Sequence, residues 1–345
     1  MLALVAEPGH AHTTRVEDIP AVAPREGEVL ARTLEVGVCG TDREISEGLF
    51  GIAPDGEQLL VLGHEALAVV ERDGYGFTRG QLVTATVRRS CGHCLACAEE
   101  SPDSCLTGDY SERGITRLNG YARELVTEDP EQLVAIPSSL GRIGVLAEPT
   151  SICERALRHA RAIGGRQPWQ LERALVIGAG AIGLLMTYLL RLANVDVLTT
   201  SLEAENPLVE SSGARYVSTL DSELSELGTF DLVVEAAGNA HMMAQTLGRL
   251  RRNGVACLLG IDPRDQKVEL DGPVLGLHTI LENRVLFGSV NAQHRDWLAA
   301  VADLDRARER WPEALEQFVS LRVPLDRFTE AFEHRGGKAT LLLSD

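Results

Sequence analysis

Two hydrophobic patterns divide this chain. Near the beginning, apolar and polar residues alternate, as in Glu28-Val-Leu-Ala-Arg-Thr-Leu-Glu-Val-Gly-Val, and such alternation is typical of a half-buried β-strand. Further short strands, separated by glycines and prolines, are predicted over 59–62, 66–71 and 82–87. The β pattern resumes at 112 and ends near 136. Short strands with frequent turns predict a small β-barrel or sandwich.

The second pattern, between 154 and 291, alternates buried apolar runs with helical stretches. Six strands are predicted over 174–177, 196–199, 216–218, 232–235, 255–260 and 286–289. This alternation is typical of an α/β fold with a doubly wound parallel sheet. Helices are predicted over 146–162, 297–302 and 311–321. A final strand over 339–343 needs a sheet to join, and the β-domain is the candidate.

A glycine turn follows the first strand of the predicted parallel sheet. Gly178, Gly180 and Gly183 form a G-x-G-x-x-G pattern between a buried strand and an apolar helix that begins near Ala181. Gly178 permits the tight turn, Gly180 lets a pyrophosphate approach the backbone, and Gly183 allows close packing. The helix N-terminus offers free N–H groups and a partial positive charge. The alternative is an ordinary strand–helix turn, but this context predicts a dinucleotide site.

Composition narrows the class of protein. The length of 345 residues is enough for two domains, and the net charge of −17 argues against nucleic acid or an anionic membrane as a partner. We find no apolar run of transmembrane length and no signal peptide at the N-terminus. Seven cysteines, four of them between 91 and 105, fit a cytoplasmic metal site better than disulfides.

The four clustered cysteines have the spacing of a metal site. Cys91, Cys94, Cys97 and Cys105 can surround one tetrahedral ion, and four thiolates close its coordination shell. We expect a structural zinc ion that orders this loop, with an iron–sulfur cluster as the alternative.

A second group of candidate ligands comes from separate strand ends. Cys39 lies at the end of one predicted strand, and His64 with Glu65 lies at the turn into another. This mixture of ligands suits zinc with an open coordination position, although a buried structural Cys39 and a surface His64 would explain the spacing equally well. Glu148 stands before a proline where the two folds join, and it is either a metal-related carboxylate or a helix-start acid.

Five motifs in this order resemble the zinc-dependent medium-chain alcohol/polyol dehydrogenases: Cys39-Gly-Thr-Asp, Gly63-His-Glu, the four-cysteine loop, Glu148-Pro and the glycine turn. A narrower resemblance is to the archaeal-type glucose dehydrogenases of this family. It rests on Cys39-Gly-Thr-Asp-Arg-Glu-Ile, Val87-Arg-Arg, Glu112-Arg-Gly-Ile and Gly288-Ser-Val-Asn. Ordinary alcohol dehydrogenases of the family usually carry a histidine where Glu44 stands here, which favours the sugar branch.

The resemblance implies a GroES-like catalytic domain over 1–153 and 292–345, with a Rossmann domain over 154–291. It places Cys39, His64 and Glu65 at the catalytic zinc, with Glu148 as a further ligand, and the four clustered cysteines at the structural zinc. It assigns Thr41 to the reacting oxygen, and it makes Thr41, Glu148, Glu112 and Asn291 the substrate contacts. A homo-dimer or homo-tetramer is also implied.

For the dinucleotide we expect contacts from the glycine turn and from the ends of the sheet strands. The residues are Gly178, Gly180, Ala181, Ile182, Gly183, Thr200, Ser201, Ala236, Gly238, Leu259, Gly260, Ser289 and Asn291.

The implied reaction is the oxidation of an aldose, D-glucose first, at C1 to the lactone, with hydride transfer to NAD or NADP. One alternative is another polyol or secondary-alcohol dehydrogenase of the same family. The other is a zinc-stabilised nucleotide-binding protein without turnover, and the joint presence of Cys39, Thr41, His64, Glu65 and Glu148 argues against it.

The choice between NAD and NADP depends on the tip of the second parallel strand. We align neutral Ser201 with the acid that binds the ribose in NAD enzymes, so the charge that repels a 2′-phosphate is missing there. The arginine pair that often marks NADP use in the glucose dehydrogenases is also missing. The sequence therefore predicts that both cofactors work, with a slight preference for NAD. The alternative is an NADP preference through an arginine elsewhere, such as Arg215.

Overall fold

The computed structural model describes residues 1–344 and divides into two compact units. The first contains Met1–Ser151, Asn291–Asp305 and Val319–Asp345, and the second contains Ile152–Val290 and Arg306–Phe318. Two of the four boundaries between them fall inside long helices, α3 (Ala147–Gly164) and α8 (His294–Arg310). None of the described helices is long and apolar enough to span a membrane.

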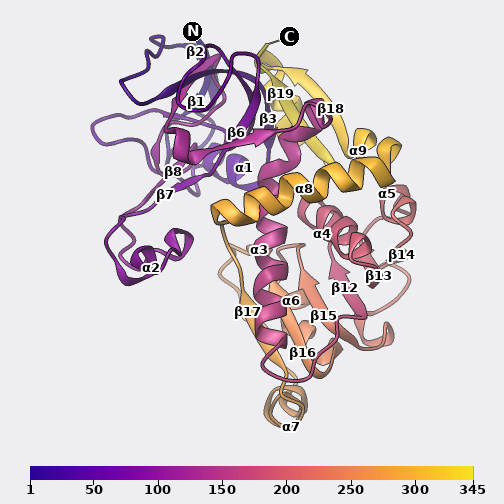
Figure 1. Ribbon diagram of the computed structural model, residues 1–345. Coiled ribbons are helices and arrows are strands. Elements are labelled where there is room, and N and C mark those ends of the chain that lie inside the picture. Colours follow the sequence, from indigo (N-terminus) through magenta and orange to yellow (C-terminus); the bar gives the residue numbers. More distant parts are fainter. Residues whose placement is uncertain (345) are drawn as a thin grey trace. The chain divides into compact units, whose positions relative to one another are not determined.

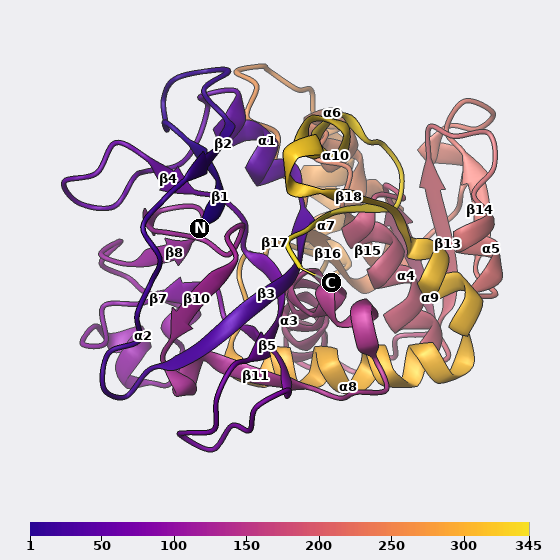
Figure 2. The ribbon, with the colours of Figure 1, turned by 90° about the horizontal axis from the view of Figure 1, so that it is seen from above.

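The first unit is built on a seven-stranded sheet. Its strands follow the order β11 (Leu133–Ile136), β6 (Leu82–Ala85), β5 (Glu65–Val70), β3 (Val29–Val38), β19 (Lys338–Leu342) and β18 (Val319–Pro324), and β10 (Leu125–Glu128) pairs with β3. Figure 2 shows β3 as the long strand of this unit. The predicted alternation along β3 is confirmed: Val29, Ala31 and Val36 are buried in one core with residues of β5, β6 and β10. The predicted terminal strand does join this sheet, antiparallel to β3.

Two smaller sheets complete the first unit. One has the order β2 (Arg15–Asp18), β1 (Leu2–Ala6) and β4 (Leu60–Val61), and the other has the order β7 (Arg88–Arg89), β8 (Ser111–Arg113) and β9 (Arg117–Leu118). The short helices α1 (Gly40–Ser46), α2 (Leu95–Ala98) and α10 (Phe328–Glu333) lie between strands.

The second unit is a six-stranded parallel sheet, as predicted (Figure 1). Its order is β14 (Arg215–Ser218), β13 (Asp196–Ser201), β12 (Arg173–Ile177), β15 (Phe230–Glu235), β16 (Leu250–Leu258) and β17 (Val285–Gly288). Helix α4 (Ala181–Leu192) packs against β12 and β13. The remaining helices are α5 (Pro207–Ser211), α6 (Ala240–Gln245), α7 (Thr279–Leu281) and α9 (Pro312–Phe318). The α/β fold class is therefore confirmed.

Two predicted elements are wrong. The first 90 residues are not all β, because α1 begins directly after Cys39, whose side chain accepts a hydrogen bond from the Thr41 N–H. The helix predicted over 311–321 ends at Phe318, and Val319–Pro324 forms a strand instead. Parallel pairing of this strand with β19 supplies backbone hydrogen bonds that a local sequence pattern cannot reveal.

The tail also differs from the expected partition. Helix α9 packs on α5 and falls within the second unit, whereas the predicted catalytic domain included all of 292–345. In the second unit Trp311 and Phe318 lie edge-on against Tyr188 of α4. Aromatic packing of this kind holds α9 against helix α4 of the second unit.

Candidate functional site

The first unit brings Cys39, His64 and Glu65 together. The Cys39 Sγ lies 3.2 Å from His64 Nε2, and the three ligand atoms lie within 4.8 Å of one another. Sheet register produces this arrangement, because Gly37 at the end of β3 is paired with Glu65 at the start of β5. A Cβ atom on Gly37 would lie 3.0 Å from the Glu65 Cβ, so only glycine leaves room for the carboxylate. His64 and Glu65 are both buried.

Asp42 lies against two members of this group. Its Oδ2 accepts the Cys39 N–H at 2.9 Å, whereas its Oδ1 lies 3.7 Å from His64 Nδ1, an electrostatic contact rather than a hydrogen bond. The sequence analysis named Asp42 only as part of a motif. Its place three residues after Cys39, the spacing of a helix capping box, could have indicated that its carboxylate turns back toward Cys39.

Lys338 is a site residue that the sequence analysis missed. Its ammonium group is buried and lies 2.7 Å from Glu65 Oε1 and 2.5 Å from Oε2. Burial acts to lower the pKa of Lys338, but Glu65 and Cys39 outweigh it and raise that pKa. Glu65 and Lys338 are 273 positions apart, so only the pairing of β19 with β3 brings them together.

Glu148 lies near this group but outside the set of three. It is the second residue of α3 and is buried. Burial raises the pKa of its carboxyl group to about 7, against the opposing effect of His64. Its assignment as a further zinc ligand stays a prediction.

The donor set fits a zinc ion. A thiolate, an imidazole and a carboxylate are ligands that zinc accepts, and three protein ligands leave one position open. Burial alone would lower the pKa of His64. The nearby Cys39 and Asp42 have a larger, opposite effect, so the pKa of His64 is raised. The imidazole therefore lies among negatively charged groups. The carboxylates of Asp42, Glu65 and Glu148 and the Cys39 thiol lie close together here, and the cationic side chains that act on them are Lys338 and Arg43.

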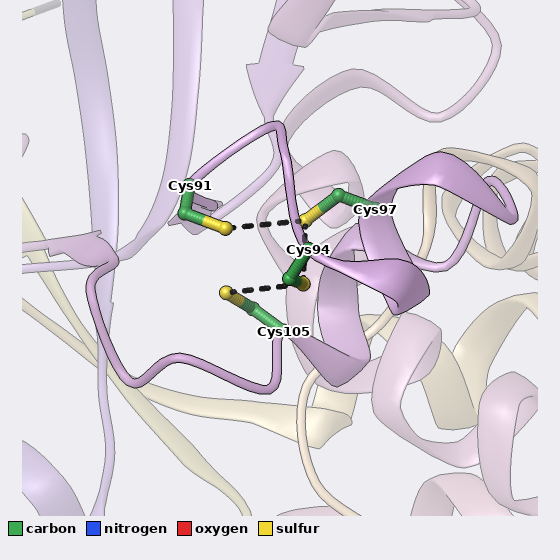
Figure 3. A group of neighbouring side chains, drawn as sticks. All are labelled: Cys91, Cys94, Cys97 and Cys105. Atoms are coloured by element: carbon green, nitrogen blue, oxygen red, sulfur yellow. Dashed lines mark hydrogen bonds between the residues drawn. The ribbon is translucent and has the colours of Figure 1, made fainter.

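The four clustered cysteines also converge. The sulfur atoms of Cys91 and Cys97 are 3.8 Å apart, those of Cys94 and Cys97 3.5 Å, and those of Cys94 and Cys105 4.0 Å (Figure 3). Four sulfur atoms at the corners of a tetrahedron, each about 2.3 Å from one zinc ion, lie about 3.8 Å apart. Helix α2 within this loop has no buried residue, so a bound metal would supply much of the order of the loop.

Arg88 links the four-cysteine loop to Glu112. Its guanidinium lies 2.9 Å from Glu112 Oε1, and it also donates a 2.5 Å hydrogen bond to the Asp103 carbonyl. The same group stacks on the ring of Tyr110, 4.0 Å from its centre. Glu112, the expected sugar contact, is therefore fixed in place by a residue that the sequence analysis had quoted only within a motif.

In the second unit the glycine turn has the geometry that a pyrophosphate needs. Gly178 has a φ of +102°, and a Cβ atom there would lie 2.7 Å from the Ala237 nitrogen. A Cβ atom on Gly183 would collide with the Gly178 carbonyl. Gly180 is the N-cap of α4 without a side-chain cap, and the space beside its Cα is open. The free N–H groups of Ala181 and Ile182 thus begin a helix ready to bind an anion.

The expected contacts after β15 and β16 meet in two adjoining turns. A Cβ atom on Gly260 would lie 2.5 Å from the Gly238 Cα and 2.8 Å from Glu235 Oε2. Glu235, which the sequence analysis missed, is buried, and its Oε1 accepts the N–H groups of Ala237 at 3.1 Å and Asn239 at 3.3 Å. Its carboxylate thereby fixes the turn that begins at Ala236. Leu259 donates its N–H to the Glu235 carbonyl at 2.8 Å.

The last two expected contacts have buried polar atoms without a hydrogen-bond partner among the described residues. These atoms are Ser289 Oγ and Asn291 Nδ2. Asn291 also has a φ of +65°, in the left-handed region where asparagine is tolerated. Buried polar groups are ordinarily satisfied, so both side chains are suited to meet a ligand.

Arg215, the example given for an arginine that could favour NADP, does not lie at the tip of β13. Arg215 begins β14 and lies 3.7 Å from Asp196, which begins β13, so it stands at the end of the strands opposite to Ser201. Thr200 is buried, and its hydroxyl donates to the Val217 carbonyl at 2.6 Å. Of the two hydroxyls expected at this tip, only that of Ser201 is outside the sheet interior.

A β-domain with a Cys–His–Glu group and a separate four-cysteine group, in one chain with a dinucleotide-binding sheet, defines the medium-chain dehydrogenase class. Comparison with known proteins agrees. The family described as alcohol dehydrogenase GroES-like domain matches residues 25–138, and the family described as glucose dehydrogenase C-terminus matches residues 141–342.

Individual relatives resemble the chain over its length. The glucose 1-dehydrogenase of Methanocella arvoryzae is 37% identical, with 96% of each chain covered. Glucose 1-dehydrogenase 1 of Caldivirga maquilingensis is 40% identical, over 96% of this chain and 95% of that protein. Haloferax mediterranei glucose dehydrogenase, solved in complex with NADP, Zn and gluconolactone, has a TM-score of 0.91 at 33% identity, with all of both chains covered. The chain therefore belongs to the zinc-dependent medium-chain dehydrogenases and, within them, to the glucose dehydrogenase family.

Proposed function

We propose that this protein oxidises D-glucose, or a close aldose, at C1 to the lactone, and that it reduces NAD or NADP in the same step. The observation that carries the proposal is the Cys39–His64–Glu65 group, within 4.8 Å, in a chain similar over its length to glucose 1-dehydrogenases. A non-catalytic relative would have no need of this open ligand set.

The roles of the site residues follow from their chemistry. Cys39, His64 and Glu65 would hold the catalytic zinc ion, with Glu148 as a further ligand, and the four clustered cysteines would hold a structural one. Bound zinc supplies Lewis acidity toward the C1 hydroxyl, and bound nicotinamide accepts the hydride. Asp42 would orient the His64 ring by its negative charge beside Nδ1. Thr41, which follows Cys39 by two positions on α1, would receive the proton of the C1 hydroxyl and pass it outward.

Sugar recognition needs polar side chains fixed before the substrate arrives. Arg88 holds the Glu112 carboxylate at 2.9 Å, so this side chain is oriented without a substrate. Asn291 offers a buried Nδ2 donor without a hydrogen-bond partner among the described residues. Both are proposed to contact sugar hydroxyls.

We also infer that the protein forms a homo-oligomer, either a dimer or a tetramer. The support lies in the second unit, where β17 is an edge strand of the sheet. Apolar side chains on and around it are exposed, among them Ile280, Leu286 and Val290. An apolar edge of this kind is suited to pairing with a second copy.

A substrate panel tests the proposed reaction. A site built to bind hydroxyl groups discriminates steeply against analogues that lack them, so kcat/KM for D-glucose should exceed that for ethanol or isopropanol at least about a hundredfold. Glu112→Ala should lower kcat/KM for the sugar and leave the zinc content unchanged, and Glu124→Ala, outside the expected contacts, serves as a matched control. A preference for simple alcohols would refute the sugar assignment.

A further inference from the structure

Glu128, the last residue of β10, is a buried carboxylate to which donors converge on one oxygen. Its Oε2 accepts the Arg113 Nε–H at 2.9 Å and the Tyr121 hydroxyl at 2.6 Å, and it lies 2.8 Å from an Arg89 nitrogen. Burial alone would raise the pKa of Glu128, but the two arginines outweigh burial and lower that pKa, so the carboxylate is charged. The proposed reaction uses none of these side chains, and the group needs an explanation of its own.

The strand pair of β7 and β8 turns two different faces toward Glu112 and toward Glu128. Arg89 of β7 lies opposite Ser111 of β8. Successive side chains of a strand point to opposite faces, so Ser111 and Arg113 share the face of Arg89, and Glu112 lies on the other face. Both arginines on the first face reach Glu128. The buried carboxylate therefore holds the strand of the expected sugar contact from behind.

The two ends of the segment 112–121 meet at Glu128. Arg113 binds the carboxylate from the start of the segment, and Tyr121 binds it from the end. The Arg113 guanidinium also donates to the Asn119 carbonyl at 3.0 Å and to the Thr127 carbonyl at 2.9 Å. It lies 5.4 Å from the centre of the Tyr121 ring. One carboxylate thus closes the segment into a loop of fixed shape.

This closed segment packs against the backbone just before the metal ligand His64. A Cβ atom on Gly114 or on Gly120 would lie 2.4 Å from the Gly63 carbonyl oxygen. Gly114 has a φ of +68°, in the region that favours glycine. Backbone therefore touches backbone without a side chain between them, and a shift of the segment is transmitted directly to the residue before His64.

We propose that Glu128 is a positioning residue that fixes the segment 112–121, and with it the Glu112 carboxylate, relative to the metal ligand His64. A sugar that is bound through its hydroxyl groups presents C1 to the metal only if these two points keep their spacing. Glu128 does not touch the substrate and acts through Glu112. The inference rests on the proposed function in so far as Glu112 contacts the sugar.

Steady-state kinetics of the zinc-loaded full chain test this role. Glu128→Gln keeps the shape of the side chain and removes the charge that the two arginines share, so KM for D-glucose should rise about tenfold. KM for the dinucleotide, kcat and the zinc content should each change less than about threefold, because the metal ligands are retained. Tyr121→Phe removes one donor and no charge, and it should raise KM for D-glucose about threefold. This milder variant carries the test if Glu128→Gln does not fold.

Glu35→Gln is the matched control within the same unit. Glu35 is also buried, lies 3.0 Å from Arg322 and 3.3 Å from Arg142, and accepts the Thr340 hydroxyl at 2.6 Å. Both glutamine variants leave two arginines without their carboxylate, so both should lower the melting temperature. Only Glu128→Gln should raise KM for D-glucose, because the partners of Glu35 include none of the expected sugar contacts.

A double-mutant cycle shows whether Glu128 acts through Glu112. The Glu112→Ala background already lacks the carboxylate that is positioned. Adding Glu128→Gln to it should therefore change KM for D-glucose by less than about twofold. A general weakening of the first unit would instead act equally in both backgrounds.

Three results would overturn the proposal: an unchanged KM for D-glucose in Glu128→Gln, or in Tyr121→Phe where the former does not fold; an equal rise in Glu35→Gln; or an undiminished effect in the Glu112→Ala background. Oxidation of D-glucose with a normal KM by Glu112→Ala would refute the sugar contact and this proposal but leave the reaction supported. A chain that oxidises no aldose would refute the reaction and, with it, the roles of both glutamates in sugar binding.

Discussion

At the scale of single residues, the two groups of metal-binding side chains differ in ligand chemistry and in setting. The four cysteines lie partly exposed in a loop and offer four thiolates to one ion. His64 and Glu65 are buried, and Glu65 is already paired with Lys338. A closed shell of thiolates holds zinc tightly, whereas a mixed set with an open position holds it less tightly.

We therefore expect about two zinc ions per chain, one of which a mild chelator removes. His64→Ala should lose the labile ion and all turnover while the far-ultraviolet circular dichroism is unchanged. Cys94→Ser should lose the retained ion and lower the melting temperature, because the metal orders this loop. Zinc per chain is measured by mass spectrometry. His93→Ala, at an exposed histidine between the cysteines, is the control and should keep both ions. Normal glucose turnover by His64→Ala would contradict the assignment.

The residues of the three-ligand group could be predicted from sequence because each stands in a short motif at a strand end. Lys338 could not be predicted, since its contact with Glu65 depends on β19 pairing with a strand made about 300 residues earlier.

At the scale of elements, the turns after β15 and β16 depend on each other. Both contain an expected cofactor contact, Gly238 and Gly260, and their backbones approach too closely for a side chain. The buried Glu235 carboxylate accepts two N–H groups of the turn after β15, next to the place where Gly238 and Gly260 approach each other. Any displacement of one turn therefore moves the other.

Gly260→Ala should reduce the free energy of unfolding by about 1–3 kcal/mol, because the new methyl group would overlap the backbone at Gly238. Dinucleotide binding should weaken in parallel. Urea unfolding and calorimetry measure the two effects. Gly288→Ala is the matched control, since a Cβ atom there meets nothing within 4 Å. Equal and small effects of both variants would show that the two turns are not closely packed.

All six strands of the parallel sheet were predictable, because buried apolar runs between turns identify them. The observed bounds differ from the predicted ones where pairing with a neighbouring strand extends a strand. Strand β16 begins at Leu250 instead of at 255, because its first residues pair with β15. Helix α1 and strand β18 were missed because neither leaves a clear local pattern in the sequence. Helix α1 is too short for hydrophobic periodicity to appear, and β18 forms only because it pairs with β19.

At the scale of the whole molecule, the parallel sheet of the second unit has two edge strands. β14 forms one edge and β17 the other. The β17 side carries the exposed apolar residues Ile280, Leu281 and Leu286. Unpaired edges with apolar side chains attract further strands, and a soluble oligomer covers them.

We expect light scattering to give a mass of about two or four times 37.3 kDa. Leu286→Arg should lower that mass, because a charge at the edge strand opposes pairing. Leu220→Arg, at a solvent-facing leucine just after β14, should leave that mass unchanged. A monomer at micromolar concentration would contradict the inferred assembly.

The position of β19 has a consequence for the order in which the protein is assembled during translation. This strand lies between β3 and β18, so the seven-stranded sheet, whose first strand ends at Val38, stays incomplete until residues 338–342 have emerged from the ribosome. The nucleotide-binding sheet has all its strands by residue 288 and can close sooner. During most of synthesis the nascent first unit therefore contains Glu65 without Lys338, its partner in the ion pair. The surroundings of the three-ligand group are completed among the last steps.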